Sequence, residues 1–110
     1  NIINLTGKWG EALELRYKTK KLYKICTNAS AARKEYGENM ARKIHQQIDF
    51  ISADDCVDTL VQGHIGRCHL LSGDRKGQYA MDLVQPYRLL FILIGNDIEI
   101  AEVQEIVDYH

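Results

Sequence analysis

The segment QYAMDLVQPYRLLFILIGNDIEIAEVQEIV spans residues 78–107 and decides the fold. Its β-branched, aromatic and other apolar residues fall into three runs, which predict strands at Gln78–Val84, Tyr87–Ile94 and Ile98–Val107. Gly95-Asn96-Asp97 stands between the last two runs and is typical of a hairpin turn. Strands joined by such short connections pair antiparallel, so this segment predicts a β-meander.

Two further strands are expected upstream. Ile65–Leu71 reads as a strand that reaches the meander through the basic turn Ser72-Gly73-Asp74-Arg75-Lys76-Gly77. Nearer the start of the chain, apolar and charged residues alternate over Leu13–Tyr17. This alternation predicts a half-buried strand.

Helices are expected between these two strands. Lys20–Cys26 predicts a short helix or turn, and Ser30 can cap a long helix after it. The long helix has apolar residues at three- and four-residue steps on one face: Tyr36, Met40, Ile44, Ile48 and Ile51. Gly37 weakens this helix and is a point at which it can divide in two. Cys56–Val61 adds a short turn of helix.

The expected fold is therefore a small α+β sandwich, in which N-terminal helices cover an antiparallel meander. With 110 residues, 45% of them hydrophobic, the chain has the size and composition of one domain with one core. Residues 1–11 carry little pattern and are expected to be an N-terminal extension. We predict a single domain over residues 1–110.

The charge balance restricts the binding partners. The chain has 14 Lys and Arg against 15 Asp and Glu, a net charge of −1. RNA-binding domains are usually basic, because neutralising phosphates supplies most of their affinity. A nucleic-acid role therefore requires local asymmetry. The basic residues do cluster in sequence, early at Lys18, Lys20, Lys21 and Lys24, and late at Arg75, Lys76 and Arg88.

The cysteines predict a reducing compartment. Cys26, Cys56 and Cys68 are odd in number and widely spaced, which argues against a disulfide framework. The sequence also has no apolar run of membrane-spanning length and no signal-peptide pattern. We therefore expect a cytoplasmic protein without a membrane partner.

Ionisable side chains gather where the last expected strand ends. Asp108, Tyr109 and His110 combine a carboxylate, a phenol and an imidazole, groups that can transfer protons or bind anions. His69 lies on another expected strand, just before the basic turn. Together they suggest a compact domain that cuts or holds a phosphodiester.

Three stretches resemble one known family. Residues 67–79 (RCHLLSGDRKGQY) and 87–91 (YRLLF) are similar to motifs of the HigB branch of the RelE/ParE toxin superfamily, the plasmid maintenance system killer proteins. The ending at residues 106–110 (IVDYH) is similar to the terminus of that branch. The resemblance is close over the second half of the chain, and the order of elements in the first half fits it.

The resemblance implies the toxin of a type II toxin–antitoxin system, a ribosome-dependent mRNA endonuclease that inhibits translation. In such toxins the ribose 2′-OH attacks the adjacent phosphate, and neither a metal nor another cofactor is needed. The implied partners are the ribosome, its mRNA and a HigA-type helix-turn-helix antitoxin. Operator DNA is contacted only through the antitoxin.

The resemblance also assigns residues to the reaction, which needs a base, an acid and positive charge on the phosphate. The expected catalytic residues are His69, Arg88, Asp108 and His110. His69 is an acid or base, Arg88 clamps the phosphate, and Asp108 orients His110; which histidine is the acid stays open. The expected RNA-binding residues are Arg75, Lys76, Tyr79, Tyr109 and Ser72. The family often has lysine where Ser72 stands, and a hydroxyl carries no charge.

Each role has a plainer alternative. His69 can simply end a strand, and Arg88 can pair with Asp82 on the sheet surface. Terminal residues are often a disordered tail. Two other functions therefore stay open: a catalytically weak or silent module that binds an antitoxin or the ribosome, and a ribosome-associated RNA binder without cleavage.

A zinc site is the least favoured alternative. Its ligands would be His64, Cys68, His69 and His110, and their spacing matches no close-paired Cys/His motif. We therefore expect no metal.

Overall fold

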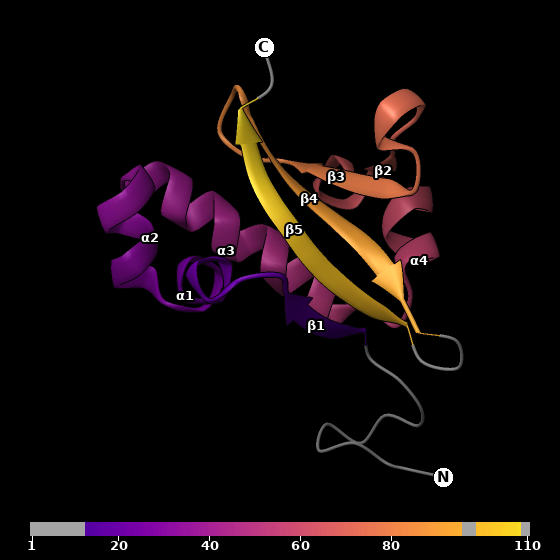
Figure 1. The fold of residues 1–110 in the computed structure, drawn as a ribbon, viewed down its shortest axis with the longest axis horizontal. Helices are drawn as coiled ribbons and strands as arrows, with labels where there is room; N and C mark the ends of the chain where they lie inside the picture. Colours follow the sequence, from indigo (N-terminus) through magenta and orange to yellow (C-terminus); the bar gives the residue numbers. More distant parts are fainter. Residues whose placement is uncertain (1–12, 96–98, 109–110) are drawn as a thin grey trace, which may run out of the picture.

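A computed structural model of the chain describes residues 13–95 and 99–108 (Figure 1). In chain order, its elements are β1 (Glu14–Tyr17), α1 (Lys20–Thr27), α2 (Ala29–Tyr36), α3 (Glu38–Ala53), α4 (Val57–Gln62), η1 (Ile65–Arg67), β2 (His69–Leu70), η2 (Gly73–Arg75), β3 (Gln78–Asp82), β4 (Tyr87–Ile94) and β5 (Ile100–Asp108). The predicted α+β class is confirmed.

The strands form one sheet in the order β1-β5-β4-β3-β2. Strands β2 to β5 are antiparallel neighbours in chain order, which confirms the predicted meander. β1 is added to it as a parallel neighbour of β5, with Leu15 opposite Ala101. A parallel neighbour requires a long crossover, and all the helices in the described part of the chain lie between β1 and β5 in sequence.

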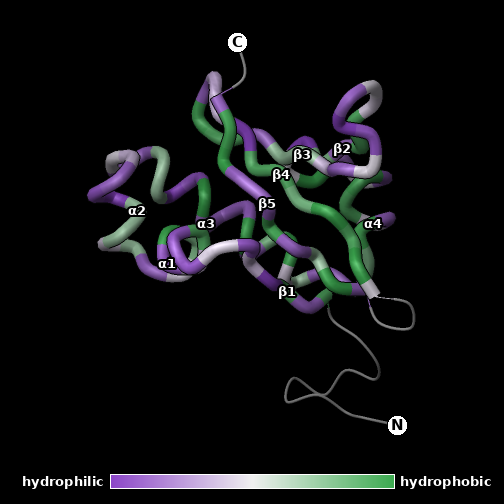
Figure 2. Tube along the Cα trace, viewed as in Figure 1, coloured by the Kyte–Doolittle hydropathy of each residue, from purple (hydrophilic) through white to green (hydrophobic). Residues whose placement is uncertain are grey.

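The helices cover one face of the sheet. Figure 1 shows α3 passing behind the strands, with α1 and α2 beside it. Ile44 and Ile51 of α3 and Leu89 and Phe91 of β4 are all 0% exposed and belong to one core. Burying each such side chain contributes about 1.5–3 kcal/mol. β4 is the most continuously hydrophobic strand (Figure 2), as expected for a strand in the interior of the sheet.

The N-terminal cap of α2 differs from the prediction. The side chain of Asn28, not Ser30, accepts the amide of Ala31 at 3.1 Å, so α2 begins at Ala29. Gly37, with φ 91°, then ends α2 and separates it from α3. Glycine adopts such a positive φ without steric cost, so the predicted division at Gly37 is confirmed.

The strand predicted over Ile65–Leu71 is wrong for most of its length. Ile65–Arg67 is a short 3-10 helix, and only His69–Leu70 pairs as β2. The reason is a turn in which His64, Gly66 and Arg67 all have positive φ, a conformation that no strand can contain. β3 also ends at Asp82 rather than Val84. Most of the expected Gly95-Asn96-Asp97 turn lies outside the described residues.

Burial of acidic groups predicts a loss of stability at alkaline pH. Burial raises the pKa of both Cys26 and Cys68 from 9.0 to about 12, and it is the largest cause that raises the pKa of Tyr17 to about 12. In the unfolded chain these groups lose their protons earlier, so the unfolded state binds fewer protons between those values. The free energy of unfolding should therefore fall as the pH rises from ~9 toward ~12, as measured by urea denaturation. The variant Cys26→Ala/Cys68→Ala should show a shallower fall; an equally steep fall would contradict this origin.

Candidate active site

Strand pairing places His69 and Arg88 on the same face of the sheet. His69 is opposite Ala80, and Arg88 is opposite Asp82. Ala80 and Asp82 are two residues apart on β3, so their side chains share a face. This is the face turned away from the helices, toward the viewer in Figure 1. We call it the open face.

His69 is held by a backbone carbonyl. Its Nδ1 lies 2.8 Å from the carbonyl oxygen of Arg67. A carbonyl can only accept, so Nδ1 carries the hydrogen. In the neutral imidazole this leaves the lone pair on Nε2, where it can accept a proton. The ring is partly exposed and lines a shallow cavity of about 160 Å³.

Two arginines share the carboxylate of Asp82. The Nε of Arg67 lies 2.9 Å from Asp82 Oδ2, and the Nε of Arg88 lies 3.9 Å from Asp82 Oδ1. The pairing of Arg88 with Asp82, expected as an alternative to phosphate binding, is therefore present. Asp82 neutralises only part of the positive charge, because two guanidinium groups share its one carboxylate. The cluster of Arg67, Arg88 and Asp82 has a net charge of +1 beside His69.

A buried amide fixes this cluster from behind. Gln47 of α3 is 0% exposed, and its Nε2 donates to the carbonyl of Gly66 at 3.1 Å and to the carbonyl of Asp82. One side chain thus joins the helix, the turn that presents Arg67 and the end of β3. Gly66 lies so close that an added Cβ would meet Gln47 Oε1 at 2.2 Å. Position 66 therefore requires glycine both for space and for its φ of +60°.

Arg75 lies across the open face. Its Nη1 donates to Gln78 Oε1 of β3 at 3.3 Å and to Glu105 Oε2 of β5 at 3.1 Å. Because β4 separates β3 from β5, the guanidinium must pass over β4. Leu90, opposite Glu105, is 0% exposed although it belongs to the open face. Arg75 therefore covers this part of the face and is held by an acid.

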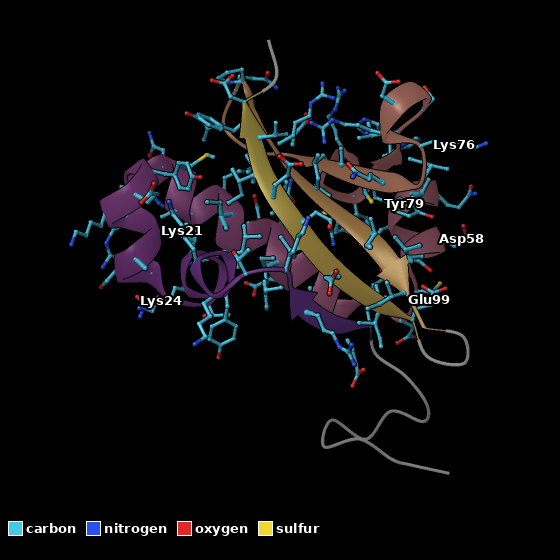
Figure 3. All side chains as sticks on the ribbon, viewed as in Figure 1. Lys21, Lys24, Asp58, Lys76, Tyr79 and Glu99 are labelled. Carbon is cyan, nitrogen blue, oxygen red and sulfur yellow. The ribbon has the colours of Figure 1, made fainter. Side chains whose placement is uncertain are left out.

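Lys76 and Ser72 flank the same loop. Both are exposed, and Figure 3 shows the Lys76 side chain extending outward from the edge of the sheet. Ser72 precedes η2 and makes no side-chain cap to it.

Tyr79 does not belong to this constellation. It is stacked on Phe91, with ring centroids 5.3 Å apart and planes 13° apart, and packs against the core. Burial is the largest cause that raises its pKa, with nearby Cys68 and Asp58 adding to it. This tyrosine therefore stays a neutral packing residue on the helix-covered face.

Asp108 is also directed away from His69 and Arg88. It pairs with Tyr87, whereas Arg88 pairs with Val107, so strand alternation puts Asp108 on the other face. Tyr109 and His110 lie outside the described residues. The structure thus brings together His69, Arg88 and Arg75, and separates Asp108 from them.

Sequence reasoning gave no role to Arg67, Gln47 or Glu105. Arg67 belongs to the motif at residues 67–79. Hydrophobic periodicity does not indicate its left-handed backbone conformation or its contact with Asp82. Gln47 occupied an expected helix, where a polar residue is normally solvated. Its spacing, three residues after Ile44 and four before Ile51, places it on the apolar stripe and was the one available sign of burial.

Metal and membrane chemistry find no support in the part of the chain that the structure describes. No three His, Cys, Asp or Glu side chains there are grouped to hold a metal ion. Cys68, a ligand of the zinc alternative, is 1% exposed, and burial raises its pKa to about 12, so it remains a thiol. None of the helices in residues 13–95 and 99–108 has the length and apolarity to cross a membrane.

Comparison with known proteins identifies the architecture. No protein-family model and no curated protein sequence matches this chain. Among solved structures, the YoeB/ParE toxin from Agrobacterium tumefaciens matches with a TM-score of 0.62, over 89% of this chain and 100% of that one. The chain shares the fold of that toxin. Their sequence identity is 14%, so the likeness concerns the fold.

The close contact at Gly66 can be tested against a matched glycine. Gly66 and Gly73 have φ of +60° and +68°, but an added Cβ at Gly73 meets nothing within 4 Å. Gly73→Ala should lower the free energy of unfolding by about 1–2 kcal/mol through backbone strain alone. Gly66→Ala should cost a further ~1–3 kcal/mol, because it displaces the buried Gln47 amide. Equal losses in urea denaturation would show that Gln47 does not fix this turn.

Proposed function

We propose that this protein is the toxin of a type II toxin–antitoxin system and cleaves mRNA on the ribosome. The observation that carries the proposal is the fold shared with a YoeB/ParE toxin over that toxin's full length. The open face supplies chemistry suited to phosphodiester cleavage: an imidazole with an available Nε2 and a cluster of net positive charge. The HigB branch is proposed from the sequence resemblance.

The proposed reaction uses the ribose next to the scissile phosphate. His69 Nε2 takes the proton of the 2′-OH, whose oxygen forms a bond to phosphorus while the bond to the 5′ oxygen breaks. The products are a 2′,3′-cyclic phosphate and a 5′-hydroxyl. The hydrogen bond from Nδ1 to the Arg67 carbonyl supports this role, because it fixes the tautomer and ring orientation.

Arg67 and Arg88 are proposed to bind the scissile phosphate. Guanidinium groups match the geometry of phosphate oxygens, and Asp82 holds both near His69. An arriving phosphate adds a second anion to a cluster of two cations. Arg67 is better placed than Arg88 for this contact, because its side chain is 72% exposed against 28%.

The remaining assignments stay proposals. Arg75, Lys76 and Ser72 would contact RNA beside the reaction site, and Tyr109 would join them. His110 would supply the proton for the leaving 5′ oxygen, with Asp108 orienting it. We propose a HigA-type antitoxin as the partner that controls the toxin and contacts operator DNA, and the cytoplasm as the site of action.

One set of observations favours a second function, that of a weak or silent module that binds an antitoxin or the ribosome. Arg88 and Arg75 each lie beside an acid, and Asp108 is on the opposite face from His69. In that case the open face would bind a partner without cleaving RNA. Direct detection of cuts separates the two functions.

The role of His69 is tested by His69→Asn. The asparagine amide can donate to the Arg67 carbonyl as Nδ1 does, but it cannot take a proton. Expressed in a bacterium, the wild-type chain should arrest growth and produce cuts in a reporter mRNA, mapped by primer extension. The variant should cut at least ~100-fold more slowly. Arrest that persists in the variant would remove His69 from the mechanism, and a folded wild type without arrest or cuts would favour the silent module.

The role of Arg67 is tested against a matched arginine. Arg42 of α3 is 74% exposed and pairs with Glu38, much as the 72% exposed Arg67 pairs with Asp82. Arg67→Ala should reduce cleavage at least ~10-fold, by loss of one charged hydrogen bond to phosphate. Arg42→Ala should leave cleavage unchanged in the same translating extract. Equal effects of the two substitutions would refute a specific phosphate contact.

A further inference from the structure

A second basic surface lies at the opposite edge of the sheet from His69. A groove of about 500 Å³ runs along β1 and the start of α1. Its lining includes Arg16, Lys18, Lys20, Tyr17 and Tyr23. We call it the β1–α1 groove. Lys21 and Lys24 follow on α1 and are labelled in Figure 3.

The charge of this groove is largely uncompensated. The stretch RYKTKKLYK, residues 16–24, contains five basic residues and no acid, and all five basic side chains are exposed. Lys21 pairs with Glu35 at 3.4 Å. Within the described residues, no acid lies at ion-pair distance from Lys18, Lys20 or Lys24. On the open face, by contrast, Arg67, Arg75 and Arg88 all have acidic neighbours.

One acid does line the groove. Glu102 of β5 lies opposite Arg16 in the parallel pairing of β1 with β5. Its Oε1 accepts a hydrogen bond from Gln104 Nε2 at 2.9 Å. The lining thus combines one carboxylate with three cations, Arg16, Lys18 and Lys20, and the net charge of the groove stays positive.

An aromatic pair stands in the same groove. The rings of Tyr17 and Tyr23 meet edge to face, with centroids 5.5 Å apart and planes at 77°. Tyr17 packs against the core, while Tyr23 is 56% exposed. The inner ring therefore fixes the outer ring, which presents its surface to solvent. A large exposed ring among lysines has no role in the core.

We propose that the β1–α1 groove binds single-stranded RNA, with Lys18 and Lys20 on phosphates and Tyr23 stacked on a base. Basic grooves with exposed aromatic rings bind single strands in this way. A membrane surface fits less well, because Tyr23 is the one large hydrophobic side chain exposed at this groove among the described residues, and binding to a membrane interface needs a larger apolar face. The choice of RNA rests on the proposed function.

The groove and the open face can hold one strand together. Arg16 lies opposite Glu102, which pairs with Ile92 on the open face. From β1 to β2 the sheet is four strand spacings wide, about 19 Å at ~4.8 Å each. A few nucleotides span that width. The groove would therefore anchor RNA whose scissile phosphate lies near His69.

The test is direct binding of a fluorescently labelled 12-nucleotide RNA, without ribosomes. Lys18→Ala/Lys20→Ala is compared with Lys34→Ala/Arg42→Ala, which removes the same charge from exposed positions on α2 and α3. Each lost phosphate contact should lower the slope of log affinity against log salt by about 0.7, so the first variant should lose about 1.4. The control should keep the wild-type slope. Equal slopes in the two variants would overturn the proposal.

Two further measurements identify the ligand. Tyr23→Ala should weaken RNA binding roughly fivefold or more, while Tyr23→Phe should retain it, because stacking needs the ring and not the hydroxyl. Vesicles containing phosphatidylserine should bind wild type and Tyr23→Ala alike. RNA binding unaffected by Tyr23→Ala, or lysine variants that lose only vesicle binding, would overturn the RNA assignment. The binding assay contains no ribosomes and does not read cleavage, so failure of the cleavage mechanism is distinguishable from failure of this groove.

Discussion

The arrangement of the open face depends on the buried amide of Gln47. From a fully buried position on α3 it donates to the carbonyls of Gly66 and Asp82. A buried donor without a partner would cost about 1–3 kcal/mol, so these contacts are strongly maintained. They hold the left-handed turn that presents Arg67, and through Arg67 the orientation of His69. A core interaction thus sets the position of the surface groups proposed to act on RNA.

Charge is divided between two parts of the sheet. Asp82 and Glu105 orient the arginines of the open face. These acids lower the net charge of that face but fix the positions of the guanidinium groups. The lysines of the β1–α1 groove have little compensation and more freedom. Oriented guanidinium groups suit a defined phosphate, whereas mobile ammonium groups suit a backbone of any sequence. This division makes the two proposed RNA surfaces compatible with a chain of net charge −1.

Local patterns predicted most of the elements. The alternation in Leu13–Tyr17 predicted β1, and the apolar runs of the meander predicted β3, β4 and β5, with bounds correct to within a few residues. Gly37 predicted the break between α2 and α3. The failure over Ile65–Leu71 has a clear cause: non-glycine residues rarely adopt positive φ, and no local pattern signals this conformation at His64 and Arg67. The cap at Asn28 could not be distinguished from the equally suitable Ser30, and only its place on the apolar stripe of α3 set Gln47 apart from a solvated glutamine.

The sequence by itself determined the fold class, the strand order of the meander and the presence of His69, Arg75 and Arg88 near one another in the chain. These follow from patterns of two to four residues, which each segment carries within itself. Only the tertiary structure decided that Arg67 joins Arg88 on Asp82, that Arg75 reaches Glu105, and that Asp108 lies on the other face. Those outcomes depend on strand register and on contacts between residues far apart in sequence, and a shift of one residue in register would reverse them.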